Sequence, residues 1–173
     1  FIDGILLPAY LGLGMLGIYM RPLVLGQMIQ VPYRAISLIS IPIIREAIVA
    51  NNMRKVYTLN KQIAINLYLI GTFLFALLVI NADAIFRLLP AQYIQAKPVL
   101  YVIAAGRLLD MAFGLNSEIL NYSKYYRIVI YLALLMMVMT VIGNILLIPR
   151  MGMVGAALAV SLSLVVFNLL KSY

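Results

Sequence analysis

Charged and amide side chains recur inside an apolar segment, Pro98 to Ser123, at spacings that suit chemistry on one helix face. Arg107, Asp110 and Gly114 follow one another at steps of three and four residues; Ser117 and Glu118 lie three and four residues after Gly114, and Asn121 lies four and three residues after these two. Residues three and four apart lie on the same side of an α-helix. These spacings predict a polar stripe, which either lines a solvated transport pathway or contains an Arg107–Asp110 pair that neutralises itself and fixes helix packing.

A second apolar segment, Pro22 to Ile44, repeats this pattern. Gln27, Gln30, Arg34 and Ser37 share one helix face, with Arg34 near the middle of the segment and no acidic residue within four positions. A charge inside hydrocarbon costs roughly 2.5 kcal/mol or more, so it needs a partner or water. The sequence leaves two partners open for Arg34: a carboxylate on another helix, such as Asp110 or Glu118, or an anionic ligand.

The residue inventory excludes several kinds of catalytic chemistry. The chain contains no cysteine and no histidine, which excludes thiol nucleophiles, disulfides and zinc sites built on these residues. Its five acidic residues form no closely spaced metal-binding pair, and there is no glycine-rich phosphate loop. We therefore expect no enzyme, no metal and no cofactor. Asp3 either lines a cavity or caps a helix end.

The elements that must position these residues are membrane-spanning helices. The chain is 65% hydrophobic and 10% charged, with a mean hydropathy of +1.07, which is typical of a membrane protein. Ile63–Ala82, Ile128–Ile148 and Met151–Leu170 are uncharged and long enough to cross a bilayer. Pro22–Ile44 and Pro98–Ser123 are long enough but contain charges. The predicted fold is all-α: one polytopic transmembrane bundle over residues 1–173, with five complete spans plus a partial span, Phe1–Leu11.

The connecting segments predict the course of the chain. We expect a short interfacial helix at Ala84–Leu89, and a turn at Pro149–Gly152 where Pro149 ends one helix and the next runs antiparallel. Pro32 and Pro42 should each bend their helix. The last helix has a face of small residues, predicting close packing on a neighbour: Gly152, Ala156, Ala159 and Ser163.

Lysine and arginine predict the orientation, since cytoplasmic links carry more of them. Seven fall on the side of the Arg45 to Lys61 link: Arg45, Arg54, Lys55, Lys61, Lys124, Arg127 and Lys171. Four fall on the other: Arg21, Arg87, Lys97 and Arg150. The first side should be cytoplasmic. Because this topology accounts for the net charge of +8, we expect the lipid bilayer as partner and no nucleic acid.

Four stretches carry a family resemblance: GIY at Gly17–Tyr19, VPYRAISLISIPIIREA at Val31–Ala47, the segment from Phe86 to Arg127, and NILLIPRMGMVGAALAVSLS at Asn144–Ser163. In order and spacing they resemble the C-terminal half of a Wzx-type lipid-linked oligosaccharide flippase. These proteins export O-antigen or capsule repeat units. They form a polysaccharide biosynthesis family within the multidrug/oligosaccharidyl-lipid/polysaccharide exporter superfamily.

The resemblance implies a transporter of two six-helix bundles that works by alternating access in the bacterial inner membrane. Its substrate would be an undecaprenyl-pyrophosphate-linked oligosaccharide, and its N-terminal helix bundle is missing here. The substrate-binding residues would then be the two arginines and their amide neighbours: Arg34, Arg107, Gln27, Gln30, Asn116 and Asn121. Asp110 and Glu118 are candidates for energy coupling.

Two other functions remain open. A cation-coupled multidrug exporter of the same superfamily should place acidic residues in its cavity, whereas the isolated charge here is Arg34. A membrane subunit of a polysaccharide polymerase or ligase should have large outer loops. The longest link here is about 17 residues.

Overall fold

The computed structural model describes residues 3–123 and 126–172, and all regular structure in these ranges is helical. In chain order the elements are α1 (Asp3–Leu11), α2 (Leu13–Gln27), the 3-10 turn η1 (Met28–Gln30), α3 (Val31–Val49), α4 (Met53–Arg87), the 3-10 helix η2 (Ala91–Ala96), α5 (Lys97–Ala112), α6 (Asn116–Asn121), α7 (Tyr126–Met151) and α8 (Met153–Ser172). The all-α prediction is confirmed.

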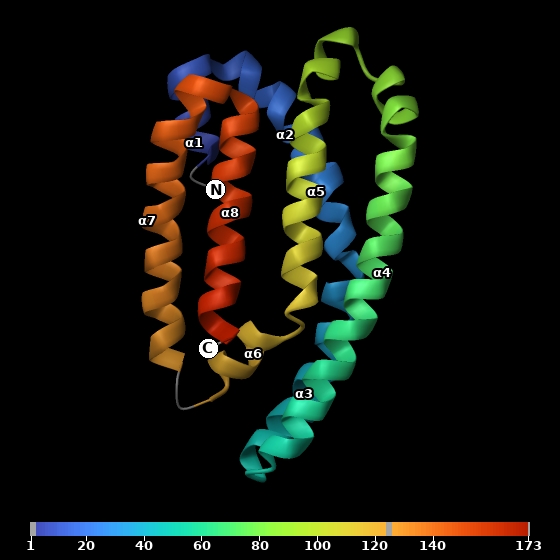
Figure 1. The fold of residues 1–173 in the computed structure, drawn as a ribbon, viewed down its shortest axis with the longest axis vertical. Coiled ribbons are helices and arrows are strands. Elements are labelled where there is room, and N and C mark those ends of the chain that lie inside the picture. Colours follow the sequence, from blue (N-terminus) through green and yellow to red (C-terminus); the bar gives the residue numbers. More distant parts are fainter. Residues whose placement is uncertain (1–2, 124–125, 173) are drawn as a thin grey trace.

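Three of these helices, α4, α7 and α8, are long and apolar enough to cross a membrane. They correspond to the three uncharged segments expected to span. The apolar window of α8 is 50% buried, against 11% for α4 and for α7. Helix α8 is thus an inner helix between α7 and α5, while α4 and α7 lie at the outer edges (Figure 1). The exposed apolar surfaces of α4 and α7 are those of a membrane protein.

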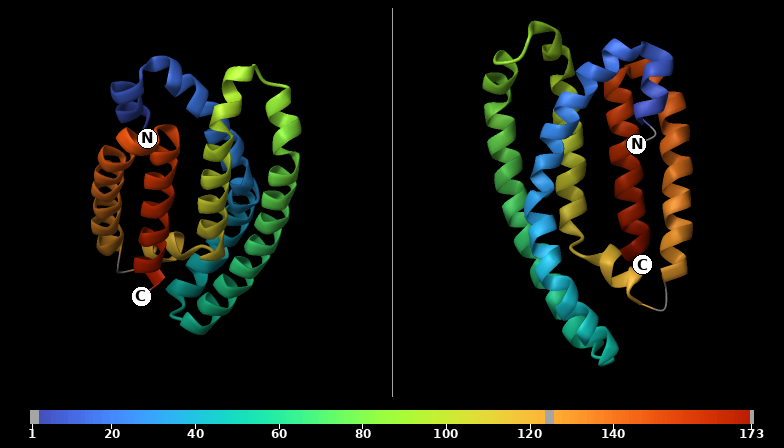
Figure 2. Two further views of the ribbon diagram at one scale, coloured as in Figure 1. Left: turned by 45° about the horizontal axis from the view of Figure 1, so that its top comes forward. Right: turned by 180° about the vertical axis from the view of Figure 1, so that it is seen from behind.

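One long helical rod is formed by α2, η1 and α3, with a change of helix type just before Pro32. Proline has no N–H to donate to the carbonyl four residues back, here that of Met28. The Met28 carbonyl instead accepts the N–H of Val31, which closes the 3-10 turn. At Pro42 α3 continues without a break. The rod and the start of α4 project beyond α6 and the adjacent ends of α7 and α8 (Figure 2).

The prediction of one continuous span over Pro98–Ser123 is wrong. Helix α5 ends at Ala112, Gly114 adopts φ +61°, and α6 lies across the end of the bundle (Figure 1). The Asn60 side chain of α4 stabilises this break, because its Oδ1 accepts the Leu115 N–H at 2.8 Å. A Cβ at Gly114 would approach that oxygen to 2.8 Å, so both the conformation and the space favour glycine.

The prediction of a separate short helix at Ala84–Leu89 is also wrong, because α4 continues to Arg87 and the link instead contains η2. Pro149 does not end its helix, because α7 runs to Met151. The turn lies at Gly152, which has φ +59° and donates its N–H to the Ile148 carbonyl at 2.8 Å. The antiparallel arrangement of α7 and α8 is confirmed (Figure 1). The partial span corresponds to the short α1, which packs on α2 and α7.

Small residues let α8 approach both of its neighbours closely. A Cβ built on Gly155 would lie 2.3 Å from the Leu147 carbonyl oxygen of α7. On the α5 side, a Cβ on Gly106 would lie 2.6 Å from Ser161 Oγ. The predicted small-residue face is confirmed for Ala156, Ala159 and Ser163, which are buried, whereas Gly152 lies in the turn before α8 and the closest approach is at Gly155.

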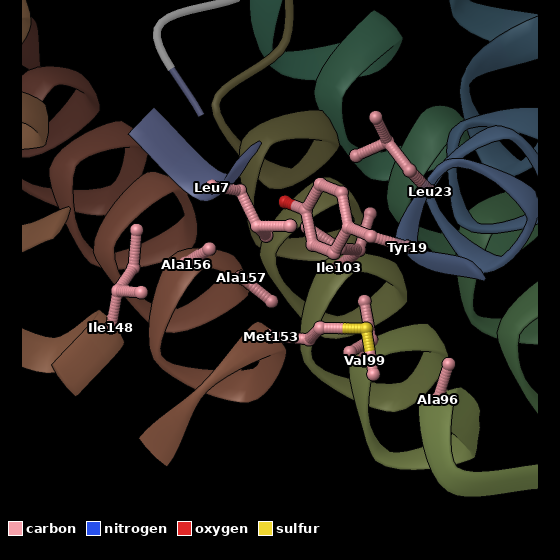
Figure 3. Close-up of a cluster of buried hydrophobic side chains, with 10 residues drawn as sticks. All are labelled: Leu7, Tyr19, Leu23, Ala96, Val99, Ile103, Ile148, Met153, Ala156 and Ala157. Atoms are coloured by element: carbon pink, nitrogen blue, oxygen red, sulfur yellow. The ribbon is translucent and has the colours of Figure 1, made fainter. Parts of the chain in front are cut away.

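A buried hydrophobic cluster joins five α-helices, α1, α2, α5, α7 and α8, and the 3-10 helix η2 (Figure 3). It includes Leu7 of α1, Tyr19 of α2, Ile103 of α5 and Ala156 of α8, each at most 1% exposed. The Tyr19 hydroxyl donates to Asp3 Oδ2 at 3.0 Å, which gives this buried carboxylate a partner. The cluster fixes α1 against the bundle and places Asp3 inside it.

The basic residues at the helix ends form two groups, one at each end of the bundle. The projecting end, where α3 passes into α4, carries the exposed Arg45, Arg54, Lys55 and Lys61. Lys171, near the end of α8, also lies toward this end. The opposite end holds Arg87, Lys97 and Arg150, at the ends of α4, α5 and α7. Lys124 lies outside the described residues.

Gly155→Ala tests the close packing of α7 and α8. The added methyl would meet the Leu147 backbone, so the helices must separate, at a cost of about 1–3 kcal/mol. The measurement is the thermal unfolding midpoint in detergent, which should fall clearly. Gly14→Ala is the control, since nothing lies within 4 Å of a Cβ there. Equal midpoints for both variants would contradict the packing described.

Candidate functional site

Asp110 of α5 is the meeting point of three elements. Gln30 Nε2 of η1 donates to its Oδ2 at 2.6 Å, and Asn168 Nδ2 of α8 donates to its Oδ1 at 2.6 Å. Asn168 is 2% exposed, while Gln30 and Asp110 are half-buried. Both carboxylate oxygens thus accept an amide N–H, as a carboxylate needs when water is scarce. No salt bridge joins Asp110 to a described cation.

A cation, Lys171 in the last turn of α8, lies near this carboxylate and near Glu118 of α6. Lys171 is buried, its Nζ donates to Ser117 Oγ, and it lies 3.9 Å from the centroid of the Phe167 ring. The carboxylates of Asp110 and Glu118 both act electrostatically on this ammonium. We call this set the Asp110 cluster: Gln30, Asp110, Ser117, Glu118, Asn168 and Lys171.

Arg107 faces a different space, a cavity of about 230 Å³ between α1, α2, α5, α7 and α8. Its polar lining consists of Arg107, Gln27, Asp3 and Thr140. The structure thus brings together Arg107 and Gln27, which the sequence assigned to the substrate, and places Asp3 at a cavity. One turn beyond Thr140, Asn144 is fully buried and its amide has no hydrogen-bond partner among the described residues.

The Arg107–Asp110 pair that the sequence allowed is not formed. In the described part of the chain no ion pair joins these two side chains, although they are three residues apart on α5. Asp110 is directed to η1 and α8, whereas Arg107 lines the cavity bounded by α1 and α7. The break at Gly114 then removes Ser117, Glu118 and Asn121 from the helix face that the spacing predicted.

Arg34 lies on α3 with its side chain exposed. No ion pair connects it to Asp110, Glu118 or any other described residue. Of the two partners that the sequence left open, the carboxylate is therefore not in place. An exposed guanidinium in the middle of an apolar helical segment remains.

The two asparagines of α6 have different surroundings. Asn116 Oδ1 accepts from Asn60 Nδ2 at 2.6 Å, which ties α6 to α4. Asn121 is exposed at the end of α6. Asn116 therefore holds the helix break in place, while Asn121 has no such structural contact among the described residues.

Three polar residues of these networks were missed: Asn60, Asn168 and Lys171. The sequence held a signal for two of them, because Ser161, Asn168 and Lys171 are seven and three residues apart and share a face of the last helix. Asn60 gave no such signal, since its partners Leu115 and Asn116 are more than 50 positions away along the chain.

Comparison with known proteins gives no match: no family model, no curated protein and no solved structure is similar to this chain. The flippase resemblance thus remains a prediction. Among the described residues no group of three acidic side chains is placed to hold a metal ion. The site can bind polar groups, and the rod could move relative to α8 if the hydrogen bonds of Asp110 to Gln30 and Asn168 were exchanged, because this one carboxylate links the two elements.

A double-mutant cycle tests the link between α5 and α8. Asp110→Ala and Asn168→Ala should each destabilise the protein, and the two should be coupled by about 1–2 kcal/mol, because each leaves the other without its partner. The free energy of unfolding in mixed micelles is the quantity to measure. Asn81→Ala is the matched control, since its amide bonds only to its own helix at the Leu77 carbonyl. Additive effects of the Asp110 and Asn168 substitutions would contradict the contact.

Proposed function

We propose that this chain is the C-terminal bundle of an alternating-access transporter. It flips an undecaprenyl-pyrophosphate-linked oligosaccharide from the inner to the outer leaflet of a bacterial inner membrane, with no covalent step. The observation that supports this most is Arg34: a guanidinium exposed on an apolar helix, without a counter-ion among the described residues. An anionic substrate would supply that counter-ion.

The chemistry of the substrate fits these side chains. A sugar pyrophosphate does not cross hydrocarbon unaided, because its charges and hydroxyl groups would lose their hydration. Guanidinium groups bind phosphate oxygens with two parallel hydrogen bonds, and amides replace water at sugar hydroxyls. In this proposal Arg34 contacts the pyrophosphate, while the lipid tail stays in the bilayer.

Five helical segments would cross the membrane in this proposal. The rod from Leu13 to Val49 and helix α5 would join α4, α7 and α8 as spans. At 1.5 Å per residue α5 is about 24 Å long, and the rod is about 55 Å long and extends past the bilayer. The projecting end would be cytoplasmic, because it carries Arg45, Arg54, Lys55 and Lys61.

Asp110 and Glu118 are the proposed coupling residues. Alternating access needs contacts that break in one state and form in the other. The Asp110 hydrogen bonds to Gln30 and Asn168 are suited to this, since they join the rod to α8. Gln30 would reach the substrate only after leaving Asp110. The Arg107 cavity, with Gln27, would be a second polar site on the path.

Arg34→Ala tests the proposal in cells that depend on this protein for export. The variant should be made at normal levels and should lose O-antigen or capsule export, because the pyrophosphate would have no cationic partner. Arg54→Ala, a basic side chain at the projecting end, is the control and should export normally. Normal export by Arg34→Ala would refute the proposed role.

The same cells separate the two other functions. If the protein exports a cationic dye, and the Arg34→Ala variant exports it equally well, the result would instead favour a multidrug exporter. Loss of polymer growth with normal transfer of the repeat unit would favour a subunit of a polymerase or ligase.

A further inference from the structure

An apolar groove separates α2 from the upper part of α4. Both helices pack on α5, and α4 also packs on η1 and α3, but α4 has few contacts with α2. The two helices diverge upward from η1 (Figure 2). The groove consists of two adjoining cavities, of about 470 Å³ and about 540 Å³. Leu25 and Ile85 line both of them.

The groove has the length of one membrane leaflet. It extends along α4 from Leu74 to Leu88, about 21 Å at 1.5 Å per residue. One leaflet has a similar thickness: half the hydrocarbon core of a bilayer is about 15 Å thick, and the headgroup region adds about 5 Å or more. The lower end of the groove, at Met28 and Ile29, lies near the middle of the rod, and its upper end, at Leu88 and Leu89, lies just past the last residue of α4.

Among the described residues that line the groove, one is a cation, and it lies at the upper end. Arg21 lines it beside Leu88, and its side chain is exposed. The guanidinium carbon lies 5.4 Å from the centroid of the Tyr93 ring, a cation–π contact that positions it. No salt bridge engages it in the ranges that the structure describes. Below it the lining is apolar except for Asn81, whose amide donates to its own helix.

We propose that this groove binds a phospholipid with an anionic headgroup, one acyl chain lying between α2 and α4 and the phosphate at Arg21. The apolar walls would bury the acyl chain, the groove is about as long as one leaflet, and the Arg21 guanidinium would pair with the phosphate. A zwitterionic lipid would fill the same walls, but its headgroup would gain less from the unpaired cation. This inference does not depend on the transport function proposed above.

The chain contains no tryptophan, so one introduced tryptophan reports on a single location. Leu77→Trp places it in the groove, at a side chain that is 51% exposed. The protein is reconstituted into vesicles in which brominated phosphatidylglycerol or brominated phosphatidylcholine quenches the fluorescence. Phosphatidylglycerol should bind about fivefold more strongly, the contribution of one basic side chain to binding an anionic lipid.

Arg21→Gln should abolish this preference, and Arg21→Lys should largely keep it because the charge remains. Arg150→Gln, at the same end of the bundle on α7, is the matched control and should keep it in full. Leu134→Trp, on the exposed surface of α7, should show equal quenching by both lipids. Equal quenching at Leu77→Trp with Arg21 present would overturn the proposal, and so would a preference that survives Arg21→Gln in a protein of normal helix content.

Discussion

The pairing of the Asp110 carboxylate is the interaction on which the arrangement of this bundle depends. A polar group in an apolar interior is costly unless it is hydrogen-bonded, and Asp110 obtains one bond from η1 and one from α8. The 3-10 turn before Pro32 contains Gln30, and the close contact of Gly106 with Ser161 lets α8 bring Asn168 near. The 3-10 turn and the close helix packing thus both bring hydrogen-bond donors to the Asp110 carboxylate.

The same constraint separates structural polar groups from those available for ligands. Asn60, Asn116 and Asn168 have partners within the protein and hold α4, α6 and α8 in place. Arg34 is exposed without a described counter-ion, and Arg107 lines a cavity. Groups of the second kind are where an anionic or polar substrate would replace the missing partner.

The sequence predicted most of the architecture but only part of the site. Uncharged runs of about 20 residues predicted α4, α7 and α8, because length and composition decide whether a helix spans. The prediction of one polar stripe was wrong beyond Gly114, because it assumed an unbroken helix. The break at Gly114 is stabilised by Asn60, a distant residue whose contact no local pattern reveals. The pairing of Gln30 with Asp110 likewise depends on tertiary packing, across a separation of 80 residues.

If Arg34 binds an anionic substrate in a transport pathway, the face of α3 around it must meet water and not lipid in the membrane. The chain has no cysteine, so single cysteines can be placed in the intact protein without other changes. Leu38→Cys lies one turn after Arg34 at a side chain that is 76% exposed, and Leu134→Cys lies on α7 at one that is 55% exposed. A membrane-impermeant maleimide should label the first and not the second. Failure to label Leu38→Cys would place Arg34 against lipid, where an anionic substrate in a solvated pathway could not reach it.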